Sequence, residues 1–246
     1  MRMKNLLILL FLPATLLAEP AFFELRTYYT NDDMLENLHS RFRDHTMKLF
    51  EKHGMTNIGY WVPQDQPETL IYLLGYNNET AREKAWKGFL NDPDWKSAYK
   101  ASTKNGKLVK KIESVYLKGT AYNPGFKIAD QDPARLFECR IYTTHEGKLD
   151  DLHARFADHT IDLFKKHGIT NLGYYTPTRK KDGASNTLLY FISHKDEASR
   201  AASFKAFSQD PDWQSARKKS EENGKILVKG GVEKTFLIPT DYSPSR

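Results

Sequence analysis

The 246-residue chain lacks most of the residues and motifs that mark well-known catalytic and metal-binding sites. Its one cysteine, Cys139, cannot form an internal disulfide or a multi-cysteine zinc site. The sequence has no HExxH motif, no histidines four residues apart, no phosphate-binding glycine-rich loop and no GxSxG motif. These absences argue against a dedicated zinc site, a nucleotide-binding loop and a serine-hydrolase site.

Long apolar runs are confined to the N-terminus. Arg2 and Lys4 precede a run from Leu6 to Leu17, and Ala18 is a small residue suited to cleavage. This is the layout of a secretory signal peptide, and the run is shorter than an ordinary transmembrane helix requires. Residues 1–18 therefore predict an exported protein, periplasmic or secreted, which would be membrane-bound only if this segment stayed uncleaved.

Clustered charge of one sign is also missing. The formal net charge is +6, but basic and acidic residues are interspersed along the chain. Nucleic-acid binding requires a clustered basic face, so we expect no nucleic-acid partner. The charge pattern leaves the oligomeric state open.

What the sequence does contain is a duplication. Residues 22–63 recur, little altered, as residues 136–177, and Asp92-Pro93-Asp94-Trp95 returns as Asp210-Pro211-Asp212-Trp213. The period of about a hundred residues is near the commonest domain size. The predicted organisation is a repeat at residues 21–122, a linker at 123–135 and a second repeat at 136–246.

Each repeat has the pattern of a β-α-β-β-α-β unit. Phe23, Leu25 and Thr27 alternate with Glu24, Arg26 and Tyr28, which is the periodicity of a strand. A helix, two strands, a second helical stretch and a last strand follow. Such a ferredoxin-like unit covers one sheet face with helices and leaves the other to be buried elsewhere. We therefore expect the two repeats to press their open faces together.

Several motifs in a fixed order carry a resemblance to a known family. They are Phe-Glu-Leu-Arg-Thr-Tyr at 23–28, Asp-His-Thr at 44–46, Lys-His-Gly at 52–54, Asn-Ile-Gly-Tyr-Trp at 57–61 and Asp-Pro-Asp-Trp at 92–95. Both repeats carry versions of these motifs and resemble the NIPSNAP domain. The resemblance implies an α+β fold in which two ferredoxin-like βαββαβ repeats form an intramolecular dimeric α/β barrel around a cavity.

The resemblance implies less about activity. The wider superfamily includes cofactor-free monooxygenases of small aromatic compounds and haem-binding enzymes, whereas the NIPSNAP family has no settled catalytic activity. Its eukaryotic members are associated with mitochondria, membrane traffic and mitophagy. Those roles do not transfer to a chain with an export signal and two domains.

The polar strand face is the first candidate site. If the apolar face of each strand meets the helices, Glu24, Arg26 and Tyr28 point into the barrel. Arginine binds carboxylates in a bidentate manner, so this face suits a small polar or carboxylated aromatic ligand. The alternative is a structural ion pair that fixes how the sheets meet. The candidate cavity residues also include Tyr60 and Tyr72, and in the second repeat Glu138, Arg140, Tyr142, Tyr174 and Tyr190.

The first helix of each repeat supplies a second candidate. His45 and His159 fall on the predicted apolar stripes, where imidazole serves as an acid, a base or a metal ligand, or is simply a core residue with satisfied nitrogens. We predict no cofactor; haem remains an alternative that would need an axial ligand facing the cavity. We predict a structural role for Asp92, as the cap of a helix that has proline at its first position.

Two hypotheses about function follow from these features. The first is an exported protein that binds a small molecule in the barrel cavity, with cofactor-free chemistry as an extension. The second is a non-catalytic interaction module of the bacterial envelope, which uses its surface and the basic loop at Arg179–Lys181.

Overall fold

The computed structural model describes residues 19–126 and 134–246, and both repeats have the predicted β-α-β-β-α-β order. The predicted signal segment, residues 1–18, lies outside the described residues, as do residues 127–133 of the predicted linker. The first repeat consists of β1 (Phe22–Thr30), α1 (Leu35–Arg41), a π-helical segment η1 (Phe42–Thr46), α2 (Met47–Lys52), β2 (Thr56–Pro63), β3 (Thr69–Tyr76), α3 (Glu79–Asn91), α4 (Pro93–Ser102) and β4 (Val109–Gly119). The second consists of β5 (Leu136–Thr144), α5 (Leu149–Arg155), a π-helical segment η2 (Phe156–Thr160), α6 (Ile161–Lys166), β6 (Thr170–Pro177), a 3-10 turn η3 (Lys180–Asp182), β7 (Thr187–His194), α7 (Glu197–Gln209), α8 (Pro211–Ser220) and β8 (Leu227–Pro239).

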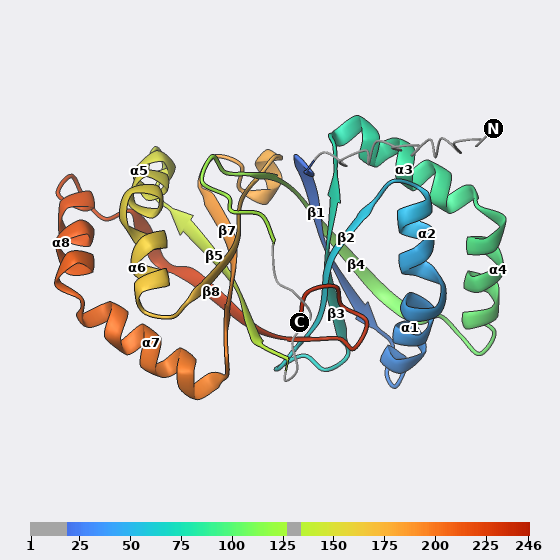
Figure 1. The fold of residues 1–246 in the computed structure, drawn as a ribbon. Coiled ribbons are helices and arrows are strands. Elements are labelled where there is room, and N and C mark those ends of the chain that lie inside the picture. Colours follow the sequence, from blue (N-terminus) through green and yellow to red (C-terminus); the bar gives the residue numbers. More distant parts are fainter. Residues whose placement is uncertain (1–18, 127–133) are drawn as a thin grey trace, which may run out of the picture.

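The strands of the two repeats close into one antiparallel barrel with the helices on its outside (Figure 1). The order around the barrel is β1-β3-β2-β8-β5-β7-β6-β4. At one seam β2 pairs with β8 through Trp61–Pro63, and at the other β4 pairs with β6 through Leu117–Gly119. The predicted intramolecular barrel is therefore confirmed.

Each repeat is also fastened by the segment that follows the last strand of the other. After β4, Tyr122 places its hydroxyl 2.6 Å from Nδ1 of His153 on α5. After β8, Tyr242 makes the equivalent contact with Nδ1 of His39 on α1, at 2.7 Å. Each repeat thus contributes an equivalent tyrosine–histidine contact to the other, in addition to the strand pairs.

The barrel interior is filled by apolar side chains from both repeats, which reverses the predicted orientation of β1 and β5. Phe23 and Leu25 point inward, and the Phe23 ring centroid lies 4.8 Å from that of Tyr175. Trp61 packs similarly against Phe137, with ring centroids 5.6 Å apart. The prediction that the polar face of each strand lines the barrel is wrong.

The polar face turns outward because only the helices offer it partners. A buried carboxylate needs hydrogen-bond donors and a counter-charge, which an interior of Phe, Leu and Trp side chains cannot supply. On the outer face, Arg82 and Trp86 of α3 both donate to Glu24. The helices outside the barrel thus supply hydrogen bonds to the polar face of the strand, and its apolar face packs inside the barrel.

The π-helical segments change which residues of the first helices face the sheet. A π turn inserts one extra residue and rotates the helix that follows it. Thr46 therefore takes the inward position, and its hydroxyl donates to the Arg41 carbonyl at 3.1 Å. His45 is exposed, and so is His159 beside the matching segment of the second repeat. The predicted positions of both histidines on the apolar stripes are wrong.

The predicted helix cap at Asp92 is confirmed, and Asn78 caps the preceding helix, α3, in the same way. Asn78 accepts a hydrogen bond from the Ala81 amide at 2.8 Å, and Asp92 accepts one from the Asp94 amide at 2.9 Å, as expected of N-caps. Asp92 also lies 2.7 Å from Nε2 of His53, at the end of α2. The Asp-Pro-Asp-Trp motif thus has a structural role that joins α2 to α4.

Candidate functional site

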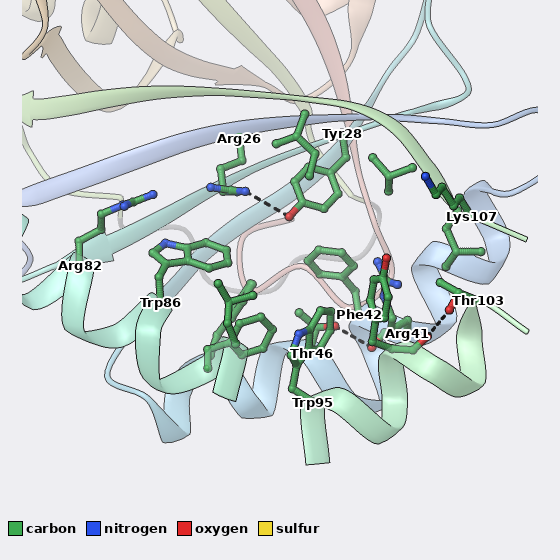
Figure 2. Close-up of a pocket in the computed structure, with 17 residues that line it drawn as sticks. Arg26, Tyr28, Arg41, Phe42, Thr46, Arg82, Trp86, Trp95, Thr103 and Lys107 are labelled. Carbon is green, nitrogen blue, oxygen red and sulfur yellow. Dashed lines mark hydrogen bonds between the residues drawn. The ribbon is translucent and has the colours of Figure 1, made fainter. Parts of the chain in front are cut away.

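A pocket of about 470 Å³ lies between the outer face of β1 and β4 and the helices of the first repeat (Figure 2). The aromatic side chains that line it are Tyr28, Phe42, Phe50, Trp86, Phe89, Trp95 and Tyr99. The charged side chains that line it are all cationic: Arg26, Arg41, Arg82 and Lys107. An aromatic slot with positive charge at both ends suits an apolar molecule that carries an anionic group.

Behind the pocket, the buried carboxylate of Glu24 forms the centre of a hydrogen-bond network. Arg82 donates to both of its oxygens, at 2.8 and 2.9 Å, and Trp86 Nε1 donates at 2.9 Å. Arg26 and Ser114 also donate to it. Burial by itself would raise the pKa of Glu24, but these hydrogen bonds and the two arginine charges lower the pKa to about 2. The carboxylate is therefore ionised and fully partnered.

Arg26 lines the pocket, but each of its three side-chain nitrogens already donates a hydrogen bond within the protein. Its Nε donates to the Tyr72 hydroxyl at 2.9 Å, and the guanidinium also bonds Glu24 and Tyr28. The guanidinium lies 4.3 Å from the centroid of the Trp86 ring. Arg26 thus supplies positive potential to the pocket rather than a free bidentate contact. The structural interpretation of the Glu-Arg-Tyr set accounts for these contacts.

The predicted strand tyrosines lie beneath this network and not in the pocket. Tyr60 and Tyr72 are buried and stack with ring centroids 5.4 Å apart. Tyr174 and Tyr190 repeat the arrangement in the second repeat at 5.3 Å. Burial raises the pKa of all four phenols well above the ordinary value. They are neutral packing residues.

The second repeat rebuilds the same network with different donors. Glu138 accepts hydrogen bonds from Arg140 and from Arg200, and His194 Nε2 lies 3.5 Å from its Oε2. His194 occupies the place of Tyr76, whose hydroxyl donates to Glu24 at 3.2 Å. Burial opposes ionisation, yet the contacts with His194 and the arginines lower the pKa of Glu138 to about 2. Tyr142 bonds Arg140, as Tyr28 bonds Arg26.

Arg41 is the pocket residue that the strand pattern did not reveal. It is the last residue of α1, and the π segment that follows it keeps both Arg41 and Thr46 on the side that faces the sheet. Only 5% of Arg41 is exposed, and its guanidinium lies 5.3 and 5.4 Å from the ring centroids of Trp95 and Tyr99. Its place beside Leu38 and Phe42 in the helix pattern was a usable signal for burial.

Candidate metal ligands are scattered over the described residues, and few of them lie at the first-repeat pocket. In residues 19–126 and 134–246, His, Cys, Asp and Glu do not gather in a group of three or more that could hold a metal ion. No histidine, cysteine or methionine is among the described residues that line the pocket. Of the side chains that bind haem iron in proteins, only the phenols of Tyr28 and Tyr99 are among the described residues that line it.

Comparison with solved structures agrees with this fold class. A proposed monooxygenase of Fusobacterium nucleatum aligns with a TM-score of 0.62 at 12% identity, over 94% of this chain and 100% of its own. A proposed monooxygenase of Lactobacillus acidophilus aligns at 0.58 and 10% identity, over 90% and 94% of the two chains. An anthrone oxidase-like protein gives 0.58 and 10%, over 93% and 95%. At these identities the likeness concerns the fold alone.

The fold and its doubled glutamate network thus define a fused α/β barrel of the kind that otherwise forms from two ferredoxin-like units. Within this class, the NIPSNAP family matches the chain twice, over residues 23–124 and 137–244, so the protein belongs to the NIPSNAP family. Comparison with curated protein sequences finds no match. In the part of the chain that the structure describes, no helix has both the length and the apolar character needed to cross a bilayer.

Proposed function

We propose that the first repeat binds a small, mainly apolar molecule in the pocket between its sheet and its helices. The observation that carries this proposal is the pocket itself, which has aromatic walls and a volume of about 470 Å³. Ligand pockets usually measure roughly 300–1,000 Å³ and combine apolar walls with a few polar groups. The proposal keeps a small molecule as ligand but places it outside the barrel instead of inside.

The mouth of the pocket supports entry of an apolar molecule. Leu90, Tyr99 and Ile112 line the pocket, yet they are 53%, 47% and 49% exposed. Large apolar side chains that gather at one exposed place mark a binding surface more often than scattered ones do. In the second repeat, Ser208 and Arg217 stand at the positions of Leu90 and Tyr99.

Binding has more support than chemistry. The structural relatives include proposed monooxygenases and an anthrone oxidase-like protein, but the likeness extends to the fold only. Activation of a substrate by proton removal needs a base near the ligand. The described residues that line the pocket include no Asp, Glu or His, and the carboxylate of Glu24 is fully engaged behind it. We therefore propose a binding protein rather than an enzyme.

The alternative of an interaction module gains less from the structure. Its candidate was the loop at Arg179–Lys181. Arg179 is tied to the barrel, since it bonds the Ser114 carbonyl and lies 3.8 Å from the centroid of the Tyr116 ring. Two exposed lysines, Lys180 and Lys181, remain for a partner. An envelope pull-down with and without these lysines tests this alternative, and unchanged partners would count against it.

Titration with a neutral apolar dye tests the proposed function. N-phenyl-1-naphthylamine should fluoresce on binding with saturation at one dye per chain. Val109→Trp places a large side chain in the pocket and should abolish saturable binding. Leu227→Trp, at the equivalent position of the second repeat, should leave it unchanged. Saturable binding that survives Val109→Trp would overturn the proposal.

Export remains a separate proposal, which rests on residues 1–18. N-terminal sequencing of protein purified from its host should give a mature chain that begins at Glu19. A chain that still begins at Met1 in a soluble cytoplasmic fraction would contradict export.

A further inference from the structure

The guanidinium of Arg41 lies at one end of the pocket without an acidic partner. Figure 2 shows Arg41, Thr103 and Lys107 at the opposite end from Arg82 and Trp86. Arg41 donates to the Ser102 hydroxyl at 3.2 Å, and its Nε has no partner among the described residues. Burial lowers the pKa of Arg41, and it lowers the pKa of Arg155, the counterpart of Arg41 in the second repeat, in the same direction. A buried, unpaired charge is costly, so this site favours an anion.

The second repeat shows where that anion belongs. Arg155, the counterpart of Arg41, is equally buried, but its Nη1 lies 3.4 Å from Oε1 of Glu221. Glu221 also pairs with Lys225 at 2.8 Å and lies 3.8 Å from Arg217. Three cations therefore share the Glu221 carboxylate. Only 11% of the Glu221 side chain is exposed.

The first repeat keeps two of these cations and lacks the carboxylate. The Asn-Gly-Lys motifs at 105–107 and 223–225 place Thr103 opposite Glu221 and Lys107 opposite Lys225. The Thr103 hydroxyl donates to the Tyr99 carbonyl at 2.8 Å, and the hydrogen-bond acceptor of Arg41 among the described residues is Ser102 instead. In the described residues Lys107 has no acidic partner, although it lines the pocket. At the sequence position of Glu221 the first repeat thus has Thr103, which lines the pocket together with Arg41 and Lys107.

We propose that the ligand of the first repeat is an apolar or aromatic acid whose anionic group pairs with Arg41, and that Glu221 takes the place of this group in the second repeat. The proposal rests on the proposed function and adds the chemical class of the ligand. Lys107, at the pocket rim, supplies the second positive charge, as Lys225 does for Glu221. The apolar body of the ligand lies along Phe42, Trp86 and Phe89, toward the Arg26 end.

The residues at the pocket rim of the first repeat differ from those at the equivalent positions of the second. This difference agrees with an anionic ligand in the first repeat and with the Glu221 carboxylate in the second. Leu90 and Tyr99 give the first repeat an apolar rim, whereas the second has Ser208 and Arg217. Arg217 belongs to the cation group around Glu221, so the polar rim serves the internal ion cluster. The two repeats differ at these two positions but agree at a third, where Ile112 and its counterpart Val232 are both apolar and exposed.

Calorimetric titration with 2-naphthoate and with its neutral amide, 2-naphthamide, tests the proposal at pH 7.5. Charge-assisted hydrogen bonds typically add enough affinity for the wild-type protein to prefer the acid by about tenfold or more. Arg41→Met should lower the ratio of the two affinities several-fold, because only the rim charge of Lys107 would remain beside the anionic group. Equal affinities in the wild-type protein, or an unchanged ratio in Arg41→Met, would overturn the assignment of Arg41.

A second pair of variants transfers the internal carboxylate to the first repeat. Thr103→Glu should pair with Arg41 and weaken naphthoate binding by about tenfold, while Thr103→Gln has the same size without the charge and should weaken it far less. Equal losses in both variants would mean that size, not charge, matters there. If naphthamide binds and Val109→Trp blocks it, but the acid is not preferred, the proposed function stands and this inference fails. If neither compound binds and the dye does not either, the proposed function fails.

Discussion

The two repeats agree closely around their buried glutamates and diverge at the far end of the helix layer. Glu24 and Glu138 each pair with one arginine of their own strand and one of the helix opposite, Arg82 or Arg200. At the other end, Arg41 faces a pocket, whereas the matching arginine of the second repeat pairs with Glu221. The glutamate networks are the same in both repeats, so we assign them to the stability of the fold. The environments of Arg41 and Arg155 differ, so we assign that difference to ligand binding in the first repeat.

Acid should weaken both repeats alike, and this is the largest effect we expect. The pKa of each buried glutamate is about 2 in the folded chain, against an ordinary 4.5. The unfolded chain therefore binds more protons below about pH 4.5, so the stabilisation is complete above that value and is lost as pH falls toward 2. Each carboxyl contributes about 3 kcal/mol, or about 6 kcal/mol together. Urea midpoints at pH 7, 4 and 3 measure the loss, and a constant midpoint would contradict it.

Single substitutions of the two glutamates test whether the shared networks are equivalent. Glu24→Gln and Glu138→Gln each leave two arginines without their anion, and each should lower the free energy of unfolding by about 3–5 kcal/mol. Glu113→Gln removes an exposed carboxylate that pairs with Lys111 and should cost less than about 1 kcal/mol. Chemical unfolding at pH 7 compares the three variants. A large difference between Glu24→Gln and Glu138→Gln would break the equivalence.

Exchange of the residues at the diverged end should act in opposite directions. Glu221→Thr leaves Arg155 without its carboxylate and should cost about 2 kcal/mol, whereas Thr103→Glu should gain about 1 kcal/mol by pairing with Arg41. Glu222→Thr removes the same charge at the exposed neighbouring position and serves as the control. Thermal unfolding follows all three. Destabilisation by Thr103→Glu would show that Arg41 does not accept an internal carboxylate.

The smallest effect is expected inside the barrel, where the first repeat has Leu25 and the second has Cys139. Both side chains are buried in the same apolar cluster, so Cys139→Leu should change the free energy of unfolding by less than about 1.5 kcal/mol. Burial also raises the pKa of the Cys139 thiol to about 12. The native protein should therefore resist a thiol reagent at pH 8 and react once unfolded. Rapid labelling of the native protein would contradict this burial.

The sequence pattern predicted the repeats, the strand and helix order and the helix caps, because alternation and capping are local properties. It did not predict which face of β1 enters the barrel. Both faces of this strand are buried, so alternation alone cannot tell them apart; partners from α3, distant in sequence, decide the matter. The π segment likewise moved His45 outward and Thr46 inward, against the regular spacing of an α-helix.

The candidate site was only partly predictable for a related reason. Arg26 and Tyr28 do line the pocket, but Arg41 and Lys107 come to the same pocket only because the fold brings α1 and the segment before β4 to one end of it. The exchange of Thr103 for Glu221 is visible in the aligned repeats. The sequence does not show that Glu221 pairs with Arg155, because only the fold brings these two side chains together.

The reciprocal seams also constrain how the chain matures during synthesis. The free edge of β2 is closed by Val62 and its neighbours pairing with β8, which the ribosome makes after every other described strand. At a synthesis rate of about 5–20 residues per second, that edge waits roughly ten seconds or more for its partner. An open edge strand is a template for pairing with other chains. The fused architecture therefore removes the search for a second subunit, but it leaves the β2 edge unpaired until β8 has been synthesised.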